Sequence, residues 1–154
     1  MWWCLLMISV IVLIFVSCFL DLFLSYLFSG IIPIFIICII PLLSFSKYKF
    51  FIFLFLGFML DVLYSDVMFI NVCFFLIMYF ISFKKNFLYL VLSSLFVYVF
   101  YIVYLFGILN ILGYGLVFNS LFSLFKYSFV INILYIIVIC FIFSRNLGLK
   151  KSLY

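Results

Sequence analysis

The sequence has no histidine, glutamate, glutamine, threonine or alanine among its 154 residues. Without histidine or glutamate, the chain has no histidine-based metal site, no histidine general base and no glutamate proton relay. The five cysteines have no close-pair spacing, so we expect them to pack as small apolar side chains rather than to bind metal or form disulfides. We therefore expect a protein that is not an enzyme and that carries no cofactor and no metal.

Charge is also scarce, and apolar residues take its place. Charged residues make up 7% of the chain, hydrophobic residues make up 74%, and the mean hydropathy is +1.69. A soluble domain carries about 25% charged residues. A small soluble fold cannot hide so much apolar surface from water. The composition excludes a soluble enzyme, a nucleic-acid-binding protein and a disordered tail, and it predicts an integral membrane protein that contacts the lipid bilayer.

Apolar residues run continuously, whereas the strands of a membrane barrel alternate apolar with polar residues. A membrane helix needs roughly 20 apolar residues. The charged residues divide the chain into six apolar segments of 15 to 23 residues, so we predict an all-α, polytopic membrane protein whose single domain, residues 1–154, is a six-helix transmembrane bundle. The expected spans are residues 2–20, 27–45, 50–64, 68–83, 87–109 and 127–143.

The basic residues predict an orientation for this bundle. Loops on the cytoplasmic side of a membrane carry an excess of lysine and arginine. With both termini cytoplasmic, Lys126 alone among the basic residues falls outside, and Asp21, Asp61 and Asp66 gather toward the outer face. The basic residues then placed on the cytoplasmic side are Lys47, Lys49, Lys84, Lys85, Arg145, Lys150 and Lys151.

Asp61 is the sharpest polar feature, because a carboxylate within a bilayer costs roughly 2.5 to 3.5 kcal/mol at the centre of a helix. Either it is a polar contact inside the bundle or with a partner helix, or it lies one turn from the outer water and reaches the headgroups. Gly57 lies four residues earlier on the same helix face and allows a neighbouring backbone to approach closely. Asn71 and Lys126 are the candidate partners of the Asp61 carboxylate.

Two further residues interrupt apolar segments. Asn132 lies in the last segment. Within a membrane helix, an asparagine side chain more often forms a hydrogen bond to a neighbouring helix than a contact with a ligand. Pro33 lies near the outer end of the second segment, where it either opens the helix or acts as a hinge.

The run Gly57-Phe58-Met59-Leu60-Asp61-Val62, followed by a short turn and a second helix closed by Lys84 and Lys85, resembles the rod shape-determining protein MreD family. That family has a Gly-Phe-x-x-Gly-Leu-x-x-Asp type run in its third helix. Asp61 falls on the aspartate of the family, Pro33 on a proline that opens its second helix, and Asn71 and Asn132 on polar positions in its later helices. The chain departs from the pattern in lacking the second glycine of that run.

The resemblance implies a non-catalytic, multi-pass subunit of the bacterial cytoplasmic (inner) membrane. Such a subunit belongs to the cell-elongation machinery, with an MreC-like protein, RodA, a class B penicillin-binding protein and the MreB filament, and helps to direct lateral peptidoglycan synthesis. The alternative is the substrate-binding membrane subunit of an energy-coupling-factor vitamin transporter, which is also a small six-helix protein. The absence of alanine and the few polar groups in the outer half argue against it. A small membrane scaffold of another kind is the third possibility.

Overall fold

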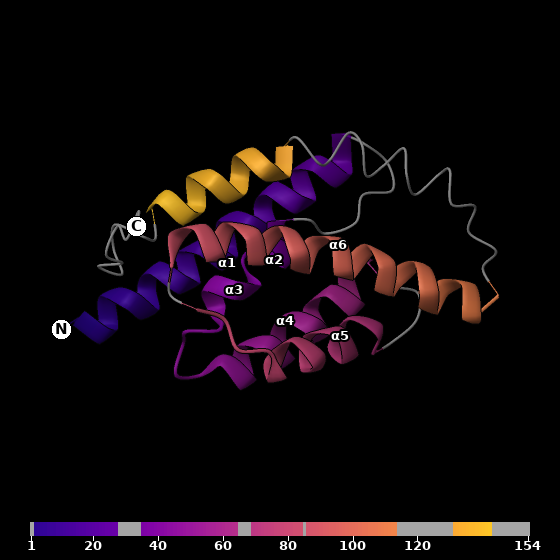
Figure 1. Cartoon of the computed structure of the whole chain (residues 1–154). Coiled ribbons are helices and arrows are strands. Elements are labelled where there is room, and N and C mark those ends of the chain that lie inside the picture. The colour runs from indigo at the N-terminus through magenta and orange to yellow at the C-terminus, as the bar shows by residue number, and fades with distance from the viewer. Residues whose placement is uncertain (1, 28–34, 65–68, 85, 114–130, 143–154) are drawn as a thin grey trace.

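The computed structural model describes residues 2–27, 35–64, 69–84, 86–113 and 131–142, and these residues form seven helices (Figure 1). No strand occurs within those ranges, so the described chain is all-α. The helices are α1 (Trp2–Leu27), α2 (Phe35–Cys38), α3 (Ile40–Leu43), α4 (Lys49–Tyr64), α5 (Ile70–Phe80), α6 (Phe87–Ile111) and a last helix, Ile131–Ile142.

The helix boundaries follow from local chemistry. Pro41 lies in the first turn of α3, where the missing N–H of proline is tolerated, and the chain breaks between α2 and α3 just before it. Phe69 precedes α5 with a left-handed backbone (φ 72°), which separates this helix from α4. Asn86 caps α6, because its side-chain oxygen accepts a hydrogen bond from the Leu88 N–H at 3.2 Å.

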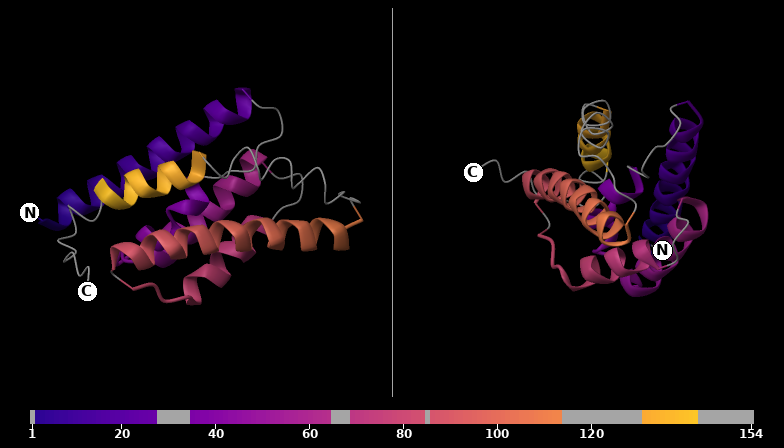
Figure 2. Two further views of the ribbon diagram at one scale, coloured as in Figure 1. Left: turned by 45° about the horizontal axis from the view of Figure 1, so that its top comes forward. Right: turned by 90° about the vertical axis from the view of Figure 1, so that its right-hand side faces the viewer.

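The helices surround a centre made of α2 and α3. Two views show α4 and α5 side by side as one pair, with α6 beside them and α1 and the last helix on the other side (Figures 1 and 2). Every residue from 35 to 43 is buried. Large side chains complete the core from α4, α5 and α6, among them Phe53, Phe74, Phe75, Met78, Tyr98 and Tyr101.

The bundle buries polar side chains and exposes apolar ones. Its exposed surface carries large apolar side chains on α1, α4, α6 and the last helix, such as Phe15 (76% exposed), Phe51 (68%) and Phe96 (62%). The buried polar residues are Ser17, Asp21, Asp61, Asn71, Ser93, Ser94 and Asn132. A soluble protein keeps most of its carboxylates and amides on the surface, so buried aspartates together with exposed phenylalanines depart from that pattern.

The helices agree with the expected spans in part. α4, α5 and α6 fall close to 50–64, 68–83 and 87–109, and the last helix falls within 127–143. The first segment does not end at Asp21, because α1 continues to Leu27, and the second is interrupted between α2 and α3. Among the described residues, α6 is the one helix both long and apolar enough to cross a membrane, and three stretches are apolar but shorter: Val10–Phe23, Ile70–Phe80 and Ile131–Ile142.

Candidate functional site

The carboxylate of Asp61, on the last turns of α4, holds the first turn of α5. Its Oδ1 accepts hydrogen bonds from the Asn71 backbone N–H at 2.8 Å and from Asn71 Nδ2 at 3.0 Å. Its Oδ2 accepts one from the Val72 N–H at 3.2 Å. The first N–H groups of a helix have no partner within the helix, and the helix dipole makes this end positive. Asp61, which is 3% exposed, therefore caps α5 from a neighbouring helix.

Two tyrosines of α6 complete this cap. The Tyr101 hydroxyl donates to Asn71 Oδ1 at 2.6 Å, which leaves the Nδ2 of that amide facing Asp61. The Tyr104 hydroxyl donates to the Ile70 carbonyl oxygen at 2.8 Å. The start of α5 is thereby bonded to α4 through a carboxylate and to α6 through two phenols. We call Asp61, Asn71, Tyr101 and Tyr104 the α5 clasp.

Gly57 permits the close approach of α4 and α5 beside the α5 clasp. A Cβ atom on this residue would lie 2.7 Å from Val72 Cα, 3.1 Å from Val72 N and 3.2 Å from Asn71 O. All three atoms belong to the backbone, so no side-chain rotation can make room. The absence of a side chain at Gly57 is what allows Asp61, one turn later, to reach the N–H groups of α5.

A second aspartate repeats the arrangement at α2. Asp21 is fully buried, and its Oδ1 and Oδ2 accept hydrogen bonds from the Phe35 N–H at 2.9 Å and the Ile36 N–H at 3.1 Å. Each aspartate thus lies toward the end of a long helix and caps the next helix described along the chain. Each also follows a small residue by four positions, Ser17 before Asp21 and Gly57 before Asp61.

Ser17 ties α1 to the last helix. Its hydroxyl donates to the Leu13 carbonyl oxygen at 2.8 Å, and its Oγ lies 2.5 Å from the Tyr135 hydroxyl. A serine has one hydroxyl proton, so Tyr135 donates in the second bond. The Tyr135 ring also packs against Phe35, with 4.2 Å between the ring centroids. Asp21, Ser17 and Tyr135 therefore connect α1, α2 and the last helix, and we call them the α2 clasp.

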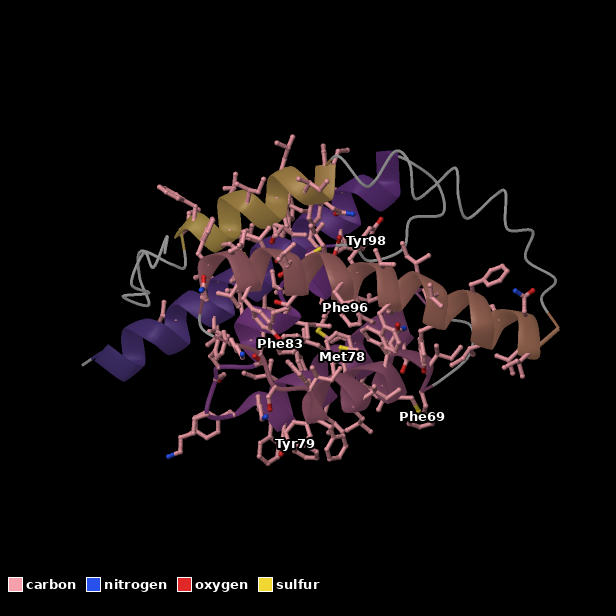
Figure 3. All side chains as sticks on the ribbon, in the orientation of Figure 1. Phe69, Met78, Tyr79, Phe83, Phe96 and Tyr98 are labelled. Atoms are coloured by element: carbon pink, nitrogen blue, oxygen red, sulfur yellow. The ribbon has the colours of Figure 1, made fainter. Side chains whose placement is uncertain are left out.

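The site residues expected from the sequence fall into three groups. The structure brings Gly57, Asp61 and Asn71 together. Asn132 is fully buried near the Tyr98 hydroxyl, yet its amide forms no hydrogen bond of regular geometry with the described residues. Tyr98 points from α6 toward the last helix, which carries Asn132 (Figure 3). Pro33 and Lys126 lie outside the described residues, as does any contact between Lys126 and Asp61.

Five members of the two clasps were not among the site residues expected from the sequence: Asp21, Ser17, Tyr135, Tyr101 and Tyr104. Asp21 was taken as the end of the first segment, although its place four residues after Ser17 matches that of Asp61 after Gly57. Tyr101 and Tyr104 carried no signal, because tyrosines occur all along the last three segments. In both clasps, carboxylate oxygens accept hydrogen bonds from backbone N–H groups. Such groups fix helices to one another, and within the described residues no three of the metal-ligating side chains (histidine, cysteine, aspartate, glutamate) gather.

Scans of the chain against protein-family models, curated proteins and solved structures found no match. Function is therefore inferred from the distribution and bonding of the side chains.

Proposed function

We propose that the chain is a multi-pass membrane scaffold, and that it serves as a non-catalytic subunit of the bacterial cell-elongation complex. The observation that carries the membrane placement is the burial of carboxylates and amides together with the exposure of large apolar side chains. Asp21, Asp61 and Asn132 are buried, while phenylalanines such as Phe15 and Phe51 are largely exposed. In water, this arrangement would leave the apolar surface without a favourable contact, whereas lipid tails cover it.

The bonding of the buried polar groups supports a scaffold. A bilayer has no water to satisfy a helix end, so each helix end within it needs a partner from the protein. Asp61 and Asp21 supply these partners for α5 and α2. Their carboxylate oxygens are engaged in holding helices together, which is a structural task. A rigid bundle with apolar outer faces suits contacts with other membrane helices.

The proposal includes six spans with both termini in the cytoplasm. In α4, Lys49 begins the helix and Asp61 lies near its other end. The end of α5 and the start of α4 lie at one end of the bundle, where Lys49 Nζ donates to the Tyr79 carbonyl oxygen (Figure 1). A helix with basic residues at its cytoplasmic end and an aspartate near the outer end follows the positive-inside rule.

The proposed partners are those of the MreD family: an MreC-like protein, RodA, a class B penicillin-binding protein and the MreB filament. The assignment is supported by the Gly57–Asp61–Asn71 arrangement, since these are the positions on which the resemblance to that family depends. The chain would contribute membrane contacts that organise lateral peptidoglycan synthesis. It would catalyse no step of that synthesis.

The second candidate is the substrate-binding subunit of a vitamin transporter, and Asn132 is the observation in its favour. A buried amide with no regular hydrogen bond among the described residues is a group that a small polar ligand could satisfy. The two functions separate by experiment, because the transporter subunit would bind a vitamin in detergent with an affinity that falls in Asn132→Leu.

Co-purification in mild detergent with the MreC-like protein of the same bacterium tests the first proposal. We expect the two proteins to elute together, and we expect Gly57→Leu to abolish this because it forces α4 and α5 apart. Gly107→Leu is the matched control, since a Cβ at Gly107 meets nothing within 4 Å. Elution of the wild-type chain away from the MreC-like protein, together with vitamin binding, would contradict the proposal and favour the transporter.

A further inference from the structure

Lys47 lies on the α3–α4 turn, Lys49 at the start of α4 and Lys84 on the α5–α6 link. The start of α4 and the end of α5 meet at one end of the bundle (Figure 1). Lys47 and Lys84 are exposed, and Lys49 is half-buried. The two aspartates among the described residues cap α2 and α5 instead. Twelve residues of helix separate Lys49 from Asp61, which is about 18 Å along the axis and far beyond the reach of an ion pair. The described residues thus supply no counter-charge for these three ammonium groups.

Lys49 is held in place rather than free. Its Nζ donates to the Tyr79 carbonyl oxygen at 3.5 Å and lies 4.6 Å from the centroid of the Tyr79 ring. Tyr79 lies at the end of α5 opposite to Phe69 (Figure 3). An ammonium group has three N–H donors, so Lys49 retains donors for a further acceptor. A fixed, half-buried ammonium loses less conformational entropy on binding an anion than a mobile one does.

The surroundings of these lysines are apolar. Phe51 (68% exposed), Phe80 (81%) and Leu88 (66%) lie within a few residues of Lys49 or Lys84 along the chain. Tyrosine rings accompany the lysines too, since Lys47 and Lys84 each lie 6.0 Å from a tyrosine ring. Cations and tyrosines directly beside exposed apolar side chains match the boundary between headgroups and acyl chains. A soluble anion would contact the ammonium groups but would gain nothing from the neighbouring apolar side chains.

We propose that this end of the bundle binds an anionic phospholipid. The headgroup phosphate accepts hydrogen bonds from Lys47, Lys49 and Lys84, and the acyl chains lie along the neighbouring phenylalanines. Basic side chains at the cytoplasmic ends of membrane helices hold anionic headgroups in this way. The inference rests on the proposed membrane placement, and it adds a lipid whose charge the site selects.

Titration of the full-length, detergent-solubilised protein with phosphatidylglycerol or phosphatidylcholine, read by native mass spectrometry, tests the site. We expect phosphatidylglycerol to bind more tightly by about tenfold or more, and each lysine replaced by glutamine to weaken it about fivefold. The variant Lys47→Gln/Lys84→Gln changes two exposed side chains and so leaves the packing intact. Adding Lys49→Gln removes the remaining ammonium group.

The matched control, Arg145→Gln/Lys150→Gln/Lys151→Gln, removes three positive charges elsewhere in the sequence and should keep the preference. Equal weakening in both triple variants, or equal binding of the two lipids by the wild type, would overturn the proposed site. Extraction of membranes with alkaline carbonate separates this failure from that of the membrane placement. A chain that stays in the membrane but binds both lipids alike contradicts the lipid site alone, whereas release of the chain by carbonate contradicts the membrane placement.

Discussion

The backbone of Gly57 in α4 packs against the backbone of Val72 in α5, so that an added Cβ would lie 2.7 Å from Val72 Cα. Val72 also donates its N–H to Asp61 Oδ2 at 3.2 Å. One residue of α5 therefore contacts α4 at two successive turns, through the missing side chain of a glycine and through a carboxylate. This pairing of close approach with a buried cap is the structural basis of the account.

Replacement of Gly57 by alanine should destabilise the protein by about 1–3 kcal/mol, because two helix backbones must move apart to admit the methyl group. The midpoint of thermal unfolding in detergent measures the change. Gly107→Ala is the matched control, since its Cβ meets nothing and alanine favours a helix by up to about 1 kcal/mol. Equal melting temperatures for Gly57→Ala and the wild type would contradict the close approach.

Replacement of Asp61 by alanine should cost about 3 kcal/mol or more, since it leaves the Asn71 and Val72 donors without their acceptor in a buried site. A double-mutant cycle with Asn71→Ala isolates the pair, and we expect a coupling of about 0.5–3 kcal/mol. Additive effects of the two substitutions would show that the pair does not act as a unit.

Removal of the Tyr101 hydroxyl by Tyr101→Phe should destabilise the bundle by about 1–3 kcal/mol, because the buried Asn71 Oδ1 loses its donor. The ring remains and keeps its packing against Phe74, so the change reports the hydrogen bond. Tyr89→Phe, at an exposed position, serves as the control and should stay within about 0.5 kcal/mol of the wild type. A Tyr101→Phe variant as stable as this control would contradict the bond.

The two clasps predict separate local effects on amide hydrogen exchange. Asp21→Ala should speed exchange at Phe35 and Ile36, and Asp61→Ala should speed it at Asn71 and Val72, because each change removes the acceptor of those N–H groups. Mass spectrometry of peptides from labelled protein resolves the two regions. Faster exchange over the whole chain in either variant would show that the caps do not act locally.

The sequence predicted α4, α5 and α6 well, since charged or turn-forming residues border each apolar run. It also pointed to Gly57, Asp61 and Asn71, because a carboxylate and a small residue four positions apart stand out in an apolar helix. The break between α2 and α3 falls just before Pro41, a residue type that ends or interrupts helices. These features have local causes that a single sequence contains.

The role of Asp21 and of the two tyrosines could not be read in the same way. Apolar residues occupy every face of α1 and α6, so the few polar ones at helical spacing, such as Ser94 and Tyr98, do not stand out as the inward face. Whether Tyr101 or Tyr89 is buried depends on which neighbours surround α6, and that is decided by tertiary packing. Asp21 looks like the end of a helix until the N–H groups of α2 are found beside it.

Topology mapping in intact cells tests the central claim most directly. Single tags or cysteines would be placed at both termini, beside Lys84 and beside Asp66, and probed with a reagent that cannot cross the membrane. Six spans with both termini in the cytoplasm predict that both termini and the Lys84 site are protected until the cells are opened, while the Asp66 site reacts at once. Termini on opposite faces of the membrane, or a reactive Lys84 site in closed cells, would contradict this topology.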